Sequence, residues 1–232
     1  CNRFRSGVLN ADAALFLMAI AIGGGAIWSM HFVGMGSLTL KNSYGDVIPV
    51  KYDVGMTILS LICAIICVYF GLLISTYDRA YSKDRGEIFL MLIEDAKNQS
   101  MKTVRSRAYL VRTALLKGIG PLAIGGVITG GGVCVMHYVG MEAMMPENVS
   151  MSWDVGIVAA SVCIAIVAAT AAFWILFRLL SLYPEVELLR ILSAVAMTIA
   201  VCGMHYTGMA AAKYTYHGNA KDDFKTGSTV SS

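Results

Sequence analysis

Residues 118–141 read GIGPLAIGGVITGGGVCVMHYVGM and contain no Asp, Glu, Lys or Arg. A helix needs roughly 20 apolar residues to cross the hydrocarbon core of a bilayer. An unpaired strand cannot satisfy its backbone polar groups in lipid, so this stretch predicts a transmembrane helix.

The rest of the chain has the same character. Four more charge-free stretches are long enough to span a membrane: residues 13–40, 54–77, 155–177 and 191–212. Only 14% of the 232 residues are charged and the mean hydropathy is +0.67, whereas a soluble domain carries about 25% charged residues. The sequence therefore predicts an all-α, polytopic bundle of five spans that forms one membrane-integral domain over residues 1–232.

Charges between the spans predict the orientation. Thirteen of the 18 Lys and Arg residues fall on the side that holds the N-terminus, residues 78–117 and the connection before the fifth span. The positive-inside rule makes this side cytoplasmic. Residues 97–117 carry six positive and no acidic residues, which predicts contact with anionic lipid or reflects the positive-inside bias alone. The net charge of +3 does not indicate nucleic-acid binding.

A short motif recurs in three of the spans. It reads SMHFVGM at 29–35, VMHYVGM at 135–141 and GMHYTGM at 203–209. An aromatic residue followed by Asp-Val-Gly opens the next helix twice, at 52–55 and 153–156. The repeating unit is thus a helix that ends outward in the motif, an outer loop and a return helix. The units cover about residues 13–77, 118–177 and 191–232, the last incomplete because it lacks a return helix.

Glycine triplets accompany two of the motifs. Residues 23–25 and 130–132 are interpreted as glycine-rich turns before the motif and as surfaces for close helix packing. We therefore expect the three motif helices to be mutual neighbours around these glycine faces.

The repeat places His31, His137 and His205 at one depth near the outer ends of three helices. A single membrane histidine most simply hydrogen-bonds a neighbouring helix, but ionisable residues at membrane depth are usually functional. Three matched copies therefore favour a shared metal site. Imidazole suits copper, zinc, iron and nickel, and thioether selects Cu(I), so copper is the suspected cofactor.

The methionines of the motif form two sets of candidate ligands. The second methionine of each copy lies four residues after the histidine and shares its helix face. The first methionine points about 100° away on an ideal helix and is the weaker candidate. The stronger set is Met35, Met141 and Met209, and the weaker set is Met30, Met136 and Met204.

Four further residues are candidates for a supporting role around the metal. Asp53 and Asp154 each open a return helix, where they most simply act as N-terminal caps. A contact of either carboxylate with a histidine is the alternative. Tyr138 and Tyr206 follow the second and third histidines.

The triple Met-His-Tyr-x-Gly-Met string resembles the MHYT domain, an integral-membrane sensor family named for this motif. The resemblance covers about residues 13–212. It implies a six- or seven-span sensor module whose motif Met, His and Tyr residues hold copper near the outer face and sense a diatomic gas or oxygen. Phe32 stands where the family has Tyr, which removes one phenol. The resemblance also implies an output domain outside this chain, often a cyclic-dinucleotide enzyme in bacteria.

These features predict a membrane signalling and sensor module that is not itself an enzyme. The alternatives are a copper-handling protein, a haem-binding protein with two axial histidines, and a structural membrane anchor. A copper transporter would need ligand sets at successive depths, whereas the three motifs lie at one end of the spans.

Overall fold

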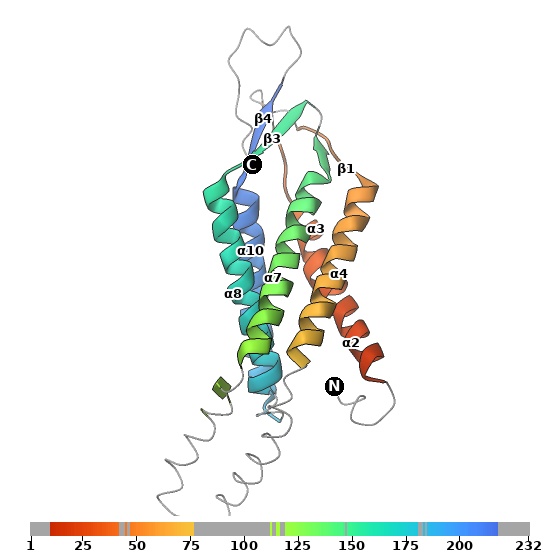
Figure 1. Cartoon of the computed structure of the whole chain (residues 1–232). Helices are drawn as coiled ribbons and strands as arrows, with labels where there is room; N and C mark the ends of the chain where they lie inside the picture. Colours follow the sequence, from red (N-terminus) through yellow and green to blue (C-terminus); the bar gives the residue numbers. More distant parts are fainter. Residues whose placement is uncertain are drawn as a thin grey trace, which may run out of the picture.

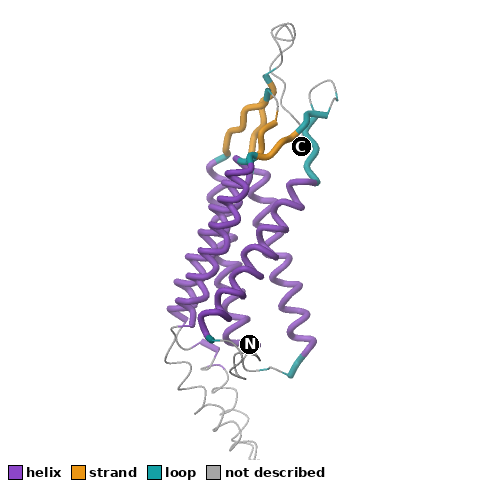
Figure 2. Tube along the Cα trace, turned by 90° about the vertical axis from the view of Figure 1, so that its right-hand side faces the viewer, coloured by secondary structure: helices purple, strands orange, loops and turns teal. Residues whose placement is uncertain are grey.

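The computed structural model describes residues 10–41, 45, 47–76, 112, 115–116, 119–146, 148–180, 183 and 185–217. Most of these residues are helical, and the long helices run side by side with short strands at one end (Figures 1 and 2). The motif helices are α2 (Ala11–Ala19), η1 (Ile20–Trp28) and α3 (Ser29–Gly36) in succession, then α7 (Ile119–Glu142) and α10 (Glu187–Ala210). The return helices are α4 (Val54–Thr76) and α8 (Val155–Trp174), which continues into η2 (Ile175–Leu179).

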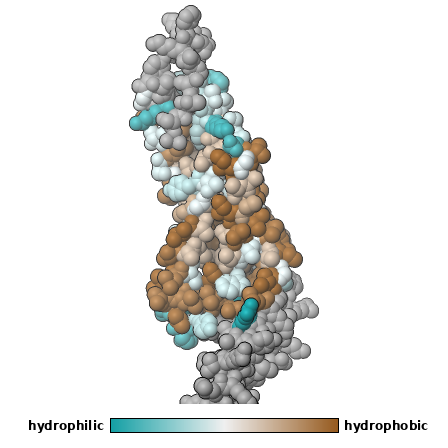
Figure 3. Space-filling view, turned by 90° about the vertical axis from the view of Figure 1, so that its left-hand side faces the viewer, coloured by the Kyte–Doolittle hydropathy of each residue, from teal (hydrophilic) through white to brown (hydrophobic). Residues whose placement is uncertain are grey.

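Five helices in the described part of the chain are long and apolar enough to cross a membrane, which confirms the predicted all-α bundle of five spans. Large apolar side chains are exposed along all of them, for example Phe70 on α4 and Val167 on α8. Figure 3 shows such side chains covering the helical part of one face, with polar residues toward the strands. The chain is thus a multi-pass membrane protein.

Two span boundaries differ from the prediction by four residues, and the others agree within two. The first span ends at Gly36 instead of Leu40, because the N–H groups of Ser37 and Leu38 bond to carbonyls only three residues back and close the helix. The fifth begins at Glu187 instead of Ile191. Its first turn contains an ion pair of 2.6 Å between Glu187 and Arg190, so two charged residues enter the helix as a pair.

The glycine triplets lie inside helices, so their interpretation as turns is wrong. Residues 23–25 belong to the π-helical segment η1 and residues 130–132 to α7. In lipid a turn would leave backbone groups without partners, whereas a helix satisfies them internally. Their interpretation as surfaces for close helix packing is confirmed: a Cβ added at Gly23 would lie 2.9 Å from the carbonyl oxygen of Ala64 on α4.

The bundle alternates motif and return helices. α7 packs along α4 on one side and α8 on the other, α10 packs on α8, and η1 packs on α4. Gly132 of α7 faces Cys67 of α4, and Gly130 faces Ile166 of α8. The motif helices meet one another only over short stretches. The motif helices are therefore neighbours, as expected, at the histidines, but the expected contact along the glycine triplets is wrong, because return helices occupy those faces.

A cap of short strands covers one end of the bundle. β1 (Val50–Tyr52) pairs with β2 (Met144–Pro146), and β3 (Val149–Trp153) pairs with β4 (Ala212–Tyr216), both antiparallel. Each pair joins the entrance of one return helix to the exit of the next motif helix. The two junctions match, because Asp53 N–H donates to the Ala143 carbonyl and Asp154 N–H to that of Ala211, both at 2.8 Å. The sequence reasoning did not predict these strands.

The predicted basic linker, residues 78–117 with its lipid-contacting part 97–117, lies outside the described residues except Arg112, Leu115 and Leu116.

Candidate metal centre

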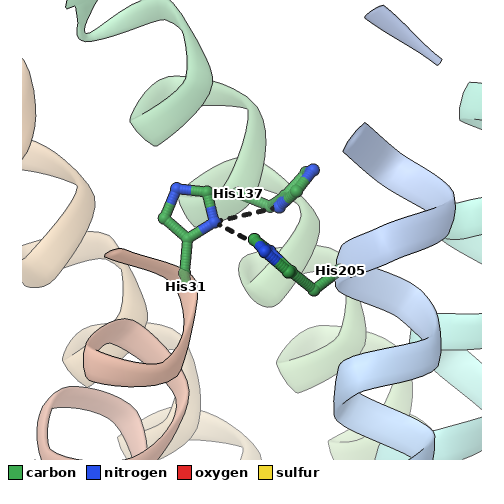
Figure 4. Close-up of side chains that lie close together, drawn as sticks. All are labelled: His31, His137 and His205. Atoms are coloured by element: carbon green, nitrogen blue, oxygen red, sulfur yellow. Dashed lines mark hydrogen bonds between the residues drawn. The ribbon is translucent and has the colours of Figure 1, made fainter. Parts of the chain in front are cut away.

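The three motif histidines converge from three helices (Figure 4): His31 from α3, His137 from α7 and His205 from α10. The Nδ1 atom of His31 lies 3.1 Å from Nδ1 of His137 and 3.2 Å from Nδ1 of His205. The three rings can offer nitrogen atoms that all lie within 4.8 Å of one another. The structure therefore brings together residues that are 174 positions apart in the chain.

The histidine cluster is fully enclosed. The exposed fractions are 1% for His31 and 0% for His137 and His205. The rings pack edge to face, with centroid separations of 4.9 to 5.2 Å and interplanar angles of 77° to 90°. Each ring thus points an edge, and not a face, at the centre.

Hydrogen bonding alone leaves this cluster poorly satisfied. A neutral imidazole has one N–H donor and one acceptor nitrogen. If Nδ1 of His31 carries a proton, it can donate to one neighbour and cannot accept from the other. If it lacks a proton, it must accept from both. The three Nε2 atoms are buried and have no hydrogen-bond partner of ordinary geometry in the described part of the chain.

The geometry also fits a metal ion. Metal–imidazole bonds are about 2.0–2.1 Å, so nitrogen ligands of one tetrahedral ion lie a little over 3 Å apart. The separations of 3.1 and 3.2 Å at His31 are close to that value, and the three rings offer nitrogen atoms that all lie within 4.8 Å of one another. Neutral imidazoles are also the form that binds a metal, and burial favours the neutral form.

The methionines of the motif fall on two sides of the histidines. Met35, Met141 and Met209 belong to an apolar cluster with residues of the strand cap, such as Leu40 and Tyr214. Met136 and Met204 belong to the cluster that extends along the helices away from the cap, and Met30 is half-buried. The structure thus separates the stronger and weaker candidate sets.

The two motif tyrosines, Tyr138 and Tyr206, differ in their contacts and in their exposure. The Tyr138 ring lies 5.0 Å from His137 and 5.0 Å from Trp153, both edge to face. Its hydroxyl donates to Ser161 Oγ at 2.6 Å, because the Ser161 proton already goes to the Val158 carbonyl. Tyr206 is 58% exposed.

In the first repeat a different aromatic residue donates to the serine of the return helix. Phe32 has no hydroxyl, and the indole N–H of Trp28 instead donates to Ser60 Oγ at 3.0 Å. The Trp28 and Phe32 rings are in contact, with centroids 4.8 Å apart. Sequence reasoning missed both serines, although each stands seven residues after the aspartate that opens its helix.

Both aspartates cap their helices, as expected. Asp154 Oδ1 accepts from the N–H groups of Gly156 and Ile157, and Asp53 Oδ1 accepts from that of Met56. Asp154 Oδ2 also binds Lys213 of β4 at 2.9 Å. Lys213 and the helix N–H groups hold the pKa of Asp154 below its ordinary value. The Asp154 carboxylate therefore ties β4 to the return helix α8.

Repeated two-helix units, each motif helix contributing one enclosed histidine, define a class of multi-pass membrane module built around a three-histidine centre. The chain belongs to the MHYT family: the family model, described as a bacterial signalling protein N-terminal repeat, matches residues 24–84 and 130–186, just over half of the chain. The resemblance drawn from the motif is thereby confirmed.

Two curated bacterial proteins match most of the chain. The bifunctional diguanylate cyclase/cyclic di-GMP phosphodiesterase MucR of Pseudomonas aeruginosa is 35% identical over 84% of this chain and 22% of its own length. The signaling protein YkoW of Bacillus subtilis is 29% identical over 84% of this chain and 19% of its own length. The chain thus spans about a fifth of these relatives. No solved structure matches it significantly.

Proposed function

We propose that this MHYT domain is a membrane sensor that holds one copper ion between His31, His137 and His205. The observation that carries the proposal is the convergence of three enclosed imidazoles, with Nδ1 of His31 3.1 and 3.2 Å from the other two Nδ1 atoms and one nitrogen of each ring within 4.8 Å of the others. Three imidazoles would leave the fourth position of a tetrahedral ion for a motif methionine or for an external ligand. A diatomic gas or oxygen is the class of signal that suits such a position.

The surroundings favour copper over other ions. Two methionines of the strand-side cluster, Met35 and Met141, are almost completely buried, and thioether ligands select Cu(I). Calcium and magnesium prefer oxygen ligands, whereas Asp53 and Asp154 are engaged as helix caps. A site for an ion that prefers oxygen ligands is therefore less suited to these residues than a site for a soft ion.

The same geometry bears on the alternatives. Imidazole rings packed edge to face at about 5 Å leave no width for a porphyrin between them, which disfavours a haem with two of these histidines as axial ligands. An interhelical hydrogen-bond cluster would need Nδ1 of His31 to serve two neighbours at once. One metal ion could take an Nδ1 ligand from each ring, and the three buried Nε2 atoms lack a partner on either account.

We also infer that the chain contributes sensing and no catalysis. The two relatives extend far beyond the part that matches this chain. The catalytic activities in the name of MucR would then belong to its remaining length, and an output partner of this chain would be a separate domain.

Copper content tests the proposal directly. The chain is purified in detergent from copper-replete cells, and metals are measured by mass spectrometry beside optical spectra for haem. We expect one copper per chain, and loss of most of it in His137→Ala or His205→Ala. His217→Ala is the matched control, because this histidine bonds Ser150 at the strand cap and not the cluster. A copper-free parent protein, or unchanged copper in His137→Ala, contradicts the proposal.

A further inference from the structure

Each motif glycine faces the histidine of another repeat. A Cβ added at Gly140 of α7 would overlap Nε2 of His31, one added at Gly208 of α10 would overlap Nε2 of His137, and one added at Gly34 of α3 would overlap Nε2 of His205. The Cδ2 atoms of the same rings would lie 2.7 to 3.1 Å from the added carbons. The three contacts form a closed cycle around the centre.

The motif spacing explains this cycle. The glycine stands three residues after the histidine in every copy, so both lie on the helix face that looks at the centre. Each helix therefore presents one ring to the centre and one bare stretch of backbone to a neighbour's ring. Real Cβ atoms do not occur at such separations, and the atoms in contact belong to rings that are themselves enclosed.

We propose that Gly34, Gly140 and Gly208 are positioning residues that decide which imidazole nitrogen faces the centre. Because Nε2 of each ring lies against glycine backbone, the ring is held with its Nδ1 edge turned inward, toward the other two rings. A histidine that binds a metal holds the proton on its other nitrogen, which normally faces a carbonyl or carboxylate. The inference that Nδ1 is the nitrogen that binds a metal rests on the proposed function, whereas the orientation of the rings does not.

The chain provides matched controls on the same helices. A Cβ at Gly36 beside α3's motif, at Gly131 of α7 or at Gly203 of α10 would meet nothing within 4 Å in the described part of the chain. Alanine at such positions should raise helix stability, because glycine is the poorer helix former. Alanine at a motif glycine should act in the opposite direction.

The first measurement uses metal-free protein in detergent and thermal unfolding. We expect Gly140→Ala to lower the midpoint by several degrees and Gly131→Ala to leave it unchanged or raise it. His31→Ala should remove the loss caused by Gly140→Ala, whereas His205→Ala should not, because its ring faces Gly34 instead. A general packing defect at Gly140 would show no such preference between the two histidines.

A variant that does not fold still gives an answer. If Gly140→Ala alone cannot be purified, the double variant with His31→Ala should be recovered and the one with His205→Ala should not. Gly208→Ala provides a second cycle, with His137→Ala as the matched partner and His31→Ala as the mismatched one. Equal behaviour of matched and mismatched pairs in both cycles overturns the proposal.

The second measurement uses copper-loaded protein and electron paramagnetic resonance after oxidation to Cu(II). We expect the nitrogen hyperfine pattern of Gly140→Ala to show fewer imidazole ligands than the parent, and Gly131→Ala to match the parent. An unchanged pattern in Gly140→Ala contradicts the positioning role. A parent that binds no copper contradicts the proposed function, while the unfolding cycles still decide the position of the rings.

Discussion

A single serine position in the return helices shows how two repeats use different residues for one interaction. Ser161 accepts the Tyr138 hydroxyl, whereas Ser60 accepts the Trp28 indole N–H. Because Trp28 stands one helical turn before Phe32, its ring reaches the same serine that a tyrosine hydroxyl would bind. The first repeat therefore keeps the hydrogen bond to the serine of its return helix, with the Trp28 indole as donor in place of a tyrosine hydroxyl.

This exchange makes Tyr138→Phe a test at the residue scale. The variant leaves Ser161 with only its bond to the Val158 carbonyl. We expect the free energy of unfolding to fall by about 0.6 kcal/mol, the average for an interhelical hydrogen bond in a membrane. The control is Phe32→Tyr, which should give no gain, because Ser60 already accepts from Trp28. A gain from Phe32→Tyr equal to the Tyr138→Phe loss would contradict this account.

Tyr214 of the strand cap should control stability at alkaline pH. Burial, and then the charge of Tyr52, raise the pKa of Tyr214 from 10.0 to about 12. The unfolded chain therefore releases this proton first, so the contribution of Tyr214 to stability is complete below pH 10 and is lost as pH rises toward 12. We expect Tyr214→Phe to reduce the fall in thermal midpoint between pH 9 and 12.

Tyr214→Phe is also informative at neutral pH. The buried Tyr214 hydroxyl has no hydrogen-bond partner in the described part of the chain, so its removal should be neutral or stabilising. Tyr216→Phe, on the same strand, is the control and should keep the alkaline loss. A destabilised Tyr214→Phe at pH 7 would show that the hydroxyl has a partner.

At the scale of elements, charge-free length located the five spans, because lipid imposes one requirement on every residue that it surrounds. The strand cap was not predictable in the same way. β2 is only Met144–Pro146, and its pairing with β1 depends on the bundle having brought distant loops together. Of the two interpretations of the glycine triplets, close helix packing is confirmed and the turn is wrong, because glycine marks a turn in water and a close helix contact in lipid.

Two neighbouring glycines of α7 differ in their surroundings: Gly130 packs against α8, whereas Gly131 is open. A Cβ at Gly130 would lie 2.7 Å from Ile166 Cα and 2.8 Å from the Ala165 carbonyl oxygen, both backbone atoms of α8 that cannot rotate away. We expect Gly130→Ala to lower the thermal midpoint by several degrees, about 1–3 kcal/mol of overpacking. Gly131→Ala should raise it slightly, since that position is open. The same change for both variants would contradict the packing of α7 on α8.

At the scale of the whole molecule, the repeat predicted that three histidines share one depth, and the structure confirms that they meet. The nitrogen that faces the centre was not predictable, because it depends on contacts between different repeats, such as Gly140 with His31. The packing order of the helices was also not predictable, because the residue spacing within one motif does not determine that α4 and α8 lie between the motif helices.

The orientation of the molecule is a proposal that charge and structure argue together. Among the described residues, Lys51 and Lys213 lie in the strand cap, whereas Arg178 and Arg190 lie at the opposite ends of their helices. Thirteen of the 18 positive residues fall in segments that the sequence predicts for that opposite side. The positive-inside rule then places the strand cap, and the histidine centre near it, on the outer side. A signal from outside would reach the centre without crossing the membrane.

Impermeant thiol labelling of intact cells tests this orientation. In a chain whose six native cysteines are replaced, a single cysteine at Ser152, exposed on β3, should react with a charged maleimide before lysis. A cysteine at Ser82, in the predicted cytoplasmic linker, should react only after the membrane is opened. Copper content measured on both variants shows that the centre is intact, so the labelled form is the native one. If only Ser82→Cys reacts in intact cells, the proposed orientation is wrong. The histidine centre would then lie near the cytoplasmic side, and its signal would come from the cytoplasm.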